Sequence, residues 1–169
     1  MRQHTLTTSR LTLRPLDAGD VQAIIYGIND IEISKWLTVV PHPYTEQDAL
    51  YFMNTIIPSA EGVHYAIDAG EGLIGVIGID PRLGYWLRRD AHGHGYMTEA
   101  ARAVISTYFA ETDMPLGSGY FLGNTASRNV LWKLGFCETY CEAVTCRATD
   151  QQVTLQNMQL TREQWKNVI

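Results

Sequence analysis

The sequence contains no run of lysine and arginine residues. Its 13 basic residues are outnumbered by 18 acidic ones, which gives a formal net charge of -5 at pH 7. Proteins that follow a phosphate backbone normally concentrate positive charge on one face or along one helix. We therefore expect no nucleic-acid partner.

Long apolar segments are absent as well. A membrane span requires about 18 or more consecutive apolar residues, and no stretch of the chain approaches that length. The opening "MRQHTLTTSRLTLRPL" lacks the apolar core of a secretory signal peptide. These absences predict a soluble, cytoplasmic protein without a membrane partner.

Cysteine is scarce. Cys137, Cys141 and Cys146 form an odd set without CxxC spacing, which argues against a disulfide framework or a zinc knuckle. We expect them to be small buried hydrophobic residues. His92 and His94 stand close together, but no cysteine or carboxylate accompanies them at ligand spacing, so we expect no metal site.

The length and composition fit one domain covering residues 1–169. The chain has 46% hydrophobic and 18% charged residues, as is ordinary for a globular protein. Apolar residues at alternating spacing predict strands, and those at helical spacing predict helices. The expected strands cover residues 10–16, 63–69, 73–80, 83–89, 116–122, 137–145 and 152–160; the expected helices cover 17–28, 45–57, 97–108, 125–134 and 162–168, with an irregular loop at 36–44. Helices that alternate with a mostly antiparallel sheet predict an α+β (mixed α/β) fold.

The stretch "DAHGHGYMTEAARAVISTYF", residues 90–109, places two glycines at the start of a helical pattern. Gly93 and Gly95 lie between a strand expected to end at Arg89 and an amphipathic helix expected from Met97. The first N–H groups of a helix lack intrahelical partners and carry partial positive charge, and glycine lets a bulky anion approach the backbone. The pattern predicts a diphosphate site; a tight turn before a well-capped helix is the structural alternative.

Two common phosphate motifs do not fit this stretch. A Walker loop requires a Gly-Lys pair, which the sequence lacks. A GxGxxG dinucleotide fingerprint requires a third glycine where Thr98 stands. Both of these nucleotide-binding classes are therefore disfavoured.

Three segments carry a family resemblance. They are "TSRLTLRPLDAGD" near the N-terminus, "LGYWLRRDAHGHGYMTEAARAV" in the middle and "GNTASRNVLWKLGF" further on. The second is close to a GYWL…GxGYxTEA pattern, and the third to N-x-x-S…KLGF. In this order and at this spacing, they resemble the GNAT superfamily of acyl-CoA N-acyltransferases, and within it the Rim-type branch of ribosomal-protein N-terminal acetyltransferases.

The resemblance implies a splayed, mostly antiparallel sheet of six to seven strands flanked by about four helices. Acetyl-CoA would lie between the fourth and fifth strands. Backbone N–H groups at the glycines would bind its diphosphate, and pantetheine would lie along an edge like an added strand. The implied cofactor-binding residues are Tyr85, Trp86, Leu87, His92, Gly93, His94, Gly95, Tyr96, Met97, Thr98, Asn124 and Ser127.

The chain departs from the family pattern at three positions. His92 stands where relatives have Gln, Arg or Trp, and Met97 stands where they have Gly or Ala. Many relatives place a tyrosine near the sulfur at the position of Leu131. Without that tyrosine, Ser127 is the implied catalytic residue, which would protonate the departing thiolate. From the residues alone, Ser127 and Asn124 are equally typical of a capped helix start.

The expected activity is acetyl transfer from acetyl-CoA to a primary amine by direct attack in a ternary complex, without a metal. The acceptor is either a protein or peptide N-terminus or a small molecule. Deprotonating a terminal amine at pH 7 costs about 1.1 kcal/mol, whereas a lysine amine costs about 4.6 kcal/mol. The alternative is a non-catalytic acyl-CoA-binding sensor or degenerate family member. A homodimer is implied by analogy.

The general base has three candidates, which are Glu138, Glu142 and a water chain. The two glutamates share a face of their strand if that strand is regular, and solvated surface positions are their structural alternative. The remaining candidates are His42 and His64 as bases, Trp36, Tyr44, Tyr85 and Trp86 as either acceptor-cleft or core residues, and Glu99 as a structural residue at the helix start.

Overall fold

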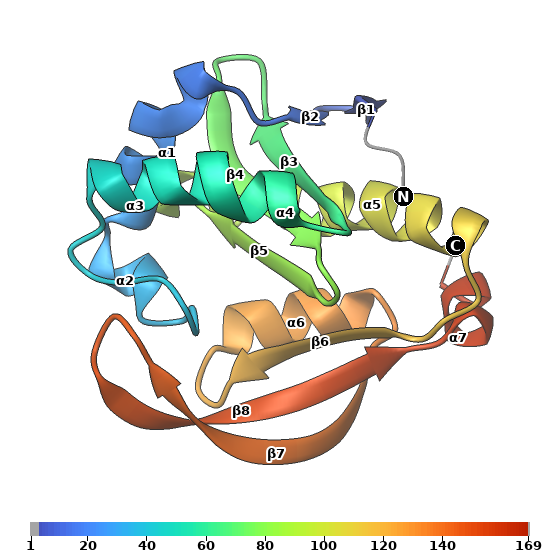
Figure 1. The fold of residues 1–169 in the computed structure, drawn as a ribbon. Helices are drawn as coiled ribbons and strands as arrows, with labels where there is room; N and C mark the ends of the chain where they lie inside the picture. The colour runs from blue at the N-terminus through green and yellow to red at the C-terminus, as the bar shows by residue number, and fades with distance from the viewer. Residues whose placement is uncertain (1–3, 169) are drawn as a thin grey trace.

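The computed structural model describes residues 4–168, which form two antiparallel sheets (Figure 1). The first sheet has the order β1 (Leu6–Thr7), β2 (Thr12–Pro15), β3 (Val63–Asp68), β4 (Leu73–Ile79) and β5 (Leu83–Leu87). The second has the order β6 (Leu116–Phe121), β8 (Gln151–Leu160) and β7 (Cys137–Cys146). The mixed α/β class and the antiparallel strands are confirmed. Eight strands form instead of six or seven because Leu6 and Thr7 pair with β2.

The helices alternate with these strands along the chain. They are α1 (Val21–Ile28), α2 (Ile31–Ser34), α3 (Glu46–Tyr51), α4 (Ile57–Ser59), α5 (Tyr96–Glu111), α6 (Thr125–Lys133) and α7 (Arg162–Lys166), with short 3-10 turns at Ala18–Asp20 and Arg89–Ala91. A π-helical segment, Phe52–Ile56, joins α3 to α4, and a capping box between Thr45 and Asp48 begins this unit. No helix among residues 4–168 is long and apolar enough to cross a membrane.

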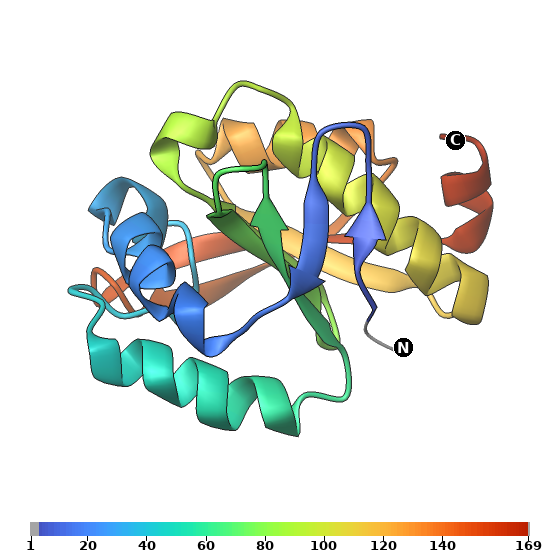
Figure 2. The ribbon, with the colours of Figure 1, turned by 90° about the horizontal axis from the view of Figure 1, so that it is seen from above.

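Helices cover both faces of the first sheet. Figure 2 shows the sheet between α3–α4 on one side and α5 and α6 on the other. Tyr65, Ile67 and Ile77 point into the cluster shared with α5, whereas Ala66 and Val76 point into the cluster shared with α1 and α3. Alternating side chains of the same strands therefore build two cores, one on each face.

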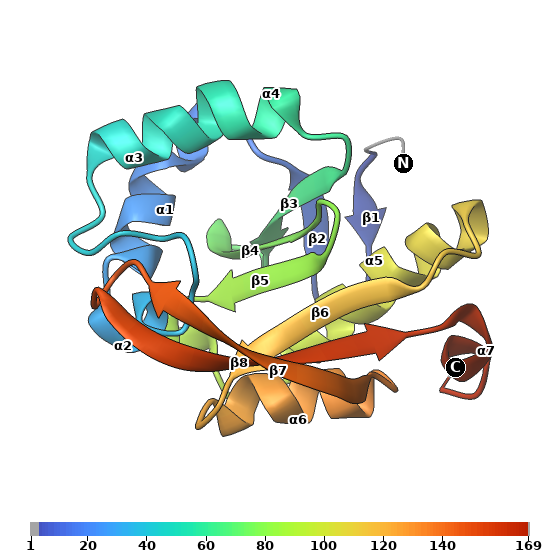
Figure 3. The same ribbon diagram turned by 60° about the horizontal axis from the view of Figure 1, so that its bottom comes forward.

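The two sheets meet at β5 and β6, which do not pair with each other (Figure 3). Side chains join them near the start of β5. Ser118 Oγ donates to the Leu83 carbonyl at 3.0 Å. Arg82 donates to the Ser118 carbonyl and, at 2.6 Å, to Asn157 Oδ1. The family resemblance implies a split at this place, between the fourth and fifth expected strands.

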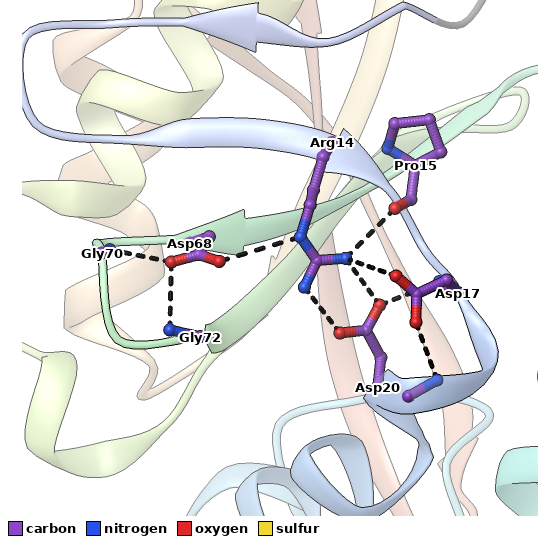
Figure 4. Close-up of polar contacts among 8 residues, drawn as sticks. Arg14, Pro15, Asp17, Asp20, Asp68, Gly70 and Gly72 are labelled. Atoms are coloured by element: carbon purple, nitrogen blue, oxygen red, sulfur yellow. Dashed lines mark hydrogen bonds and ion pairs between the residues drawn. The ribbon is translucent and has the colours of Figure 1, made fainter.

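A single arginine, Arg14, together with the aspartates around it, fixes the start of α1 (Figure 4). The Arg14 guanidinium contacts both Asp20 oxygens at 2.7 and 2.8 Å, and its Nε lies 3.7 Å from Asp68. Asp68 also accepts from the N–H groups of Gly70 and Gly72 in the β3–β4 turn. Burial acts to raise the pKa of Asp20, but the hydrogen bond from Arg14 leaves it below its ordinary value. Strand β2, the β3–β4 turn and α1 are thus held together through one side chain.

The cysteines differ from the expectation. Cys146 is buried, but Cys137 and Cys141 are exposed. Both exposed residues lie on β7, a strand that is paired on one side only and is open to solvent along most of its length. The prediction of small buried residues is therefore wrong for two of the three.

Candidate functional site

The helix that follows the twin glycines begins without a side-chain cap. Gly95 is the N-cap of α5 with a φ of 79°, and Gly93 has a φ of 81°. The first intrahelical bond runs from the Glu99 N–H to the Gly95 carbonyl, so the amides of the three residues before Glu99 have no partner within the helix. By contrast, side chains cap α3 and α6.

The glycine bend is also open to its surroundings. A Cβ built on Gly93 meets nothing within 4 Å, and one built on Gly95 meets only the end of Arg10 at 3.6 Å. Left-handed φ values of this kind favour glycine, and the open space gives a bulky group access to the backbone. This arrangement fits the diphosphate of a nucleotide, which would be held by the amides of Gly93 to Thr98.

The side chains next to the glycine bend pack against the core or against one another. Met97 is buried in the core beneath α5, so its side chain does not crowd the helix start. The rings of His94 and Tyr96 stack with centroids 5.5 Å apart. His92 Nε2 lies 2.9 Å from the Leu87 carbonyl oxygen. No group of three potential metal-ligating side chains gathers in the part of the chain that the structure describes.

Strand β5 presents backbone groups to the split between the sheets. The Arg88 N–H donates to the Ile74 carbonyl of β4 at 2.8 Å. Because hydrogen-bonded positions alternate in an antiparallel pair, the backbone groups of Tyr85 and Leu87 point away from β4. Trp86 faces β4 through its backbone, and its ring packs against α1, where a Cβ on Gly27 would lie 2.7 Å away. Tyr85 and Leu87 therefore direct backbone groups toward an extended ligand, although the Leu87 carbonyl already contacts His92 Nε2.

The Tyr85 side chain crosses to α6 and meets the implied catalytic residue. Its hydroxyl lies 2.9 Å from Ser127 Oγ, and Asn124 Oδ1 accepts from the Ser127 N–H at 3.1 Å. Burial raises the pKa of Tyr85 to about 12, although the hydrogen bond with Ser127 acts in the opposite direction. Sequence reasoning missed this use of the Tyr85 hydroxyl. Alternation along the strand puts Tyr85 on the same face as Leu83 and Leu87, but nothing in the sequence shows that α6 lies opposite.

The two glutamates on β7 do not share a face. A β-bulge between Glu138 and Cys141 shifts the register, so Glu138 stands opposite Met158 and Glu142 opposite Leu155, three residues apart on β8. Glu138 accepts from the Tyr120 hydroxyl at 2.9 Å and from Arg128 at 3.3 Å.

These partners lower the pKa of Glu138, with the Tyr120 hydrogen bond the larger cause. Glu142 accepts from the buried Asn157 Nδ2 at 2.8 Å. The strand is therefore not regular between the two glutamates, and each of them has hydrogen-bond partners of its own.

Most of the other candidate bases and aromatic residues lie in surroundings that are typical of a structural role. His64 packs edge-on against Phe52, and burial lowers its pKa, which favours the neutral ring. Tyr44 is buried against α1, while His42 lies in the exposed loop. Trp36 lies 3.7 Å from the position of a Cβ on Gly123, next to the start of α6. Trp36 therefore reaches the loop that precedes α6, and Tyr85 contacts Ser127 itself.

Comparison with known proteins agrees with this geometry. Residues 10–137 match the family described as "Acetyltransferase (GNAT) domain". The chain is 26% identical to the Bacillus subtilis protein named "Putative ribosomal N-acetyltransferase YdaF", over 76% of this chain and 78% of that one.

Solved structures show the same fold. RimJ of Mycobacterium smegmatis, in complex with CoA-disulfide, has a TM-score of 0.78 at 17% identity, covering 90% of this chain and 82% of that one. RimL, described as a ribosomal L7/L12 alpha-N-protein acetyltransferase in complex with coenzyme A, has a TM-score of 0.79 at 16% identity, covering 94% of this chain and 98% of that one. The family match spans most of the chain, including the glycine bend and Ser127, and the chain belongs to the GNAT acetyltransferase family.

Proposed function

We propose that the protein transfers the acetyl group of acetyl-CoA to a terminal amine of a protein or peptide. The observation that carries this proposal is the path of β5. Its middle residue, Tyr85, meets Ser127, and its end leads through Arg89–Ala91 into the open glycine bend. One strand thus connects a pair of hydroxyl groups with a set of backbone amides suited to a diphosphate.

Acetyl-CoA supplies an acetyl group activated as a thioester. The amides of Gly93, His94, Gly95, Met97 and Thr98 would bind its diphosphate, and the edge of β5 at Tyr85 and Leu87 would pair with its pantetheine arm. His92 and Tyr96 support the bend through the Leu87 carbonyl and the His94 ring. Trp86 contributes by holding β5 against β4 and α1.

Ser127 is the proposed proton donor. As the amine nitrogen forms its bond to the acetyl carbon, the carbon–sulfur bond breaks and the sulfur requires a proton. Ser127 Oγ donates that proton and takes one from the Tyr85 hydroxyl at 2.9 Å, and Tyr85 regains a proton from solvent, which receives the proton that the amine loses. Asn124 orients Ser127 by capping the helix that carries it.

The amine must lose a proton, and its chemical type decides how difficult that is. A terminal amine costs about 1.1 kcal/mol to deprotonate at pH 7, against about 4.6 kcal/mol for lysine. The former needs only a weak base, such as Glu142 or a water chain. The names of YdaF and RimL, which refer to ribosomal and alpha-N-protein acetyltransferases, support the same class of acceptor.

Release of CoA thiol tests the proposal. The protein is mixed with acetyl-CoA and peptides that differ only in a free or blocked N-terminus, with a small-amine panel in parallel. We expect thiol release with free N-termini and none with blocked ones. Release with small amines alone would contradict the acceptor class.

A non-catalytic acyl-CoA sensor is the second candidate. Leu131, fully buried in the core, replaces the tyrosine that many relatives use, which favours this alternative. CoA binding without thiol release for every amine would support it. A cytoplasmic location and a homodimer remain predictions.

A further inference from the structure

The turn between β1 and β2 contacts the glycine bend, although more than 80 residues separate them. Glu99 Oε1, in the first turn of α5, accepts from Thr8 Oγ1 at 2.6 Å, from Ser9 Oγ at 2.9 Å and from the Arg10 N–H at 2.9 Å. Glu99 Oε2 accepts from Arg10 Nε at 2.7 Å and pairs with Arg10 Nη2 at 2.6 Å. Both carboxylate oxygens are therefore engaged by this one turn.

Arg10 also reaches the bend itself. Its Nη1 donates to the His94 carbonyl at 2.9 Å, and its guanidinium lies 4.8 Å from the centre of the Tyr96 ring. These two residues flank Gly95. A glycine in a left-handed conformation has more backbone freedom than any other residue, so an unsupported bend would lose the fixed direction of its amides. Arg10 restrains the bend from both sides.

The same contacts resolve an electrostatic conflict. A carboxylate in the first turn of α5 lies close to the place where an anion would bind, and like charges repel. Burial acts to raise the pKa of Glu99, but the hydrogen bonds from Thr8, Arg10 and Ser9 bring it to about 2, so it is charged at neutral pH. The ion pair with Arg10 offsets that charge.

A depression of about 650 Å³ adjoins the bend, and the N-terminal turn forms part of its wall. Its lining includes Thr8, Ser9, Gly95, Thr98 and Arg102. The turn therefore faces the same space as the backbone amides. Arg10 does not line the depression itself, but it reaches the bend from the same turn through the His94 carbonyl.

We propose that Arg10 is a positioning residue that holds the glycine bend in the conformation that binds the cofactor diphosphate. This inference rests on the proposed function. Because Arg10 acts on the diphosphate end only, its removal weakens cofactor binding and leaves the chemistry at the acetyl group unchanged. A residue that merely stabilised the fold would affect every donor alike.

Arg10→Ala tests the inference with two donors that differ in the diphosphate. We expect the Kd for CoA, measured by calorimetry, and the KM for acetyl-CoA to rise about tenfold, with kcat nearly unchanged. The kcat/KM for S-acetylpantetheine, which has no diphosphate, stays at the wild-type value. In the free protein, hydrogen exchange of the Glu99 amide, whose bond to the Gly95 carbonyl closes the first turn of α5, becomes faster.

Two variants serve as references. Arg162→Ala removes a partly exposed arginine that pairs with Asp113, and we expect wild-type values for both donors. Arg10→Lys keeps the charge but cannot bridge carboxylate and carbonyl in the same way, so its CoA affinity falls between those of the wild type and Arg10→Ala.

Unchanged CoA affinity in Arg10→Ala, or equal losses with both donors, would overturn the inference about Arg10. If the wild-type protein itself binds no CoA, the proposed function fails instead.

Discussion

The Tyr85 hydroxyl lies 2.9 Å from Ser127 Oγ, although 42 residues separate the two in sequence. The contact joins the edge strand of the first sheet to the helix that packs beside the second. In the proposed function, this contact is the path by which Ser127 regains the proton that it gives to the departing sulfur.

Removing either hydroxyl should slow the chemical step. We expect Ser127→Ala to lower kcat about a hundredfold and Tyr85→Phe about tenfold, with little change in CoA affinity. Because the two act in one chain, the double variant should lose less than the product of the single losses. Tyr140→Phe, which changes an exposed tyrosine on β7, serves as the control for loss of a tyrosine hydroxyl. Wild-type turnover in Ser127→Ala would rule out its role as proton donor.

Adding a methyl group at Gly93 tests whether the open glycine bend binds CoA. Gly93→Ala adds that methyl at a φ of 81°, with backbone strain of about 1 kcal/mol, and we expect CoA affinity to fall about tenfold. Gly72→Ala is a matched control, because Gly72 also has a positive φ and nothing within 4 Å of its Cβ position. Both variants should lose similar thermal stability, but only Gly93→Ala should lose CoA affinity in calorimetry. Equal affinities would show that the bend does not bind the nucleotide.

The two glutamates of β7 should respond differently to neutralisation. Glu138 is already hydrogen-bonded to Tyr120 and Arg128, which makes it a poor base, so Glu138→Gln should leave kcat within about twofold of the wild-type value. If Glu142 takes the amine proton, Glu142→Gln should lower kcat about tenfold or more, and most strongly at low pH, where fewer amines are neutral. Peptide acetylation measured between pH 6 and pH 9 separates these outcomes. Equal rates for Glu142→Gln and wild type across that range would leave the water chain as the base.

Acid should weaken the attachment of α1 through Asp20. The folded-state pKa of Asp20 is below its ordinary value, so the stability that it contributes is present above the unfolded pKa of about 3.9 and is lost as pH falls through the folded pKa. We expect Asp20→Asn to lower the free energy of unfolding by about 2 kcal/mol at pH 7, because it leaves Arg14 without its main partner. In urea denaturation, the difference from wild type should shrink below pH 4. A constant difference down to pH 2 would contradict this role of Asp20.

Local patterns in the sequence predicted much of the fold. The apolar spacing from Met97 to Tyr108 predicted α5, and alternation predicted the β3–β4–β5 meander, because both depend on residues close together in the chain. Helix α2 was missed since its four residues are too few to show a period. Strand β1 was missed for the same reason, with two residues that are stabilised by pairing with β2.

In the candidate site, too, local features could be predicted from the sequence and long-range contacts could not. The glycine bend could be predicted, because glycine spacing before a helix is a local signal. The Tyr85–Ser127 contact and the attachment of Arg10 to Glu99 could not, since each joins residues brought together by packing between elements. The shared face assumed for Glu138 and Glu142 failed because a bulge inserts an irregularity that alternation does not reveal.

Titration of the protein with CoA, followed by backbone amide resonances in nuclear magnetic resonance spectra, tests the proposed diphosphate site most directly. We expect the largest shifts at the amides of Gly93, Gly95 and Thr98, with much smaller shifts there when pantetheine alone is added. Unshifted amides at these positions, with CoA bound elsewhere or not at all, would contradict the assignment of the glycine bend as the diphosphate site.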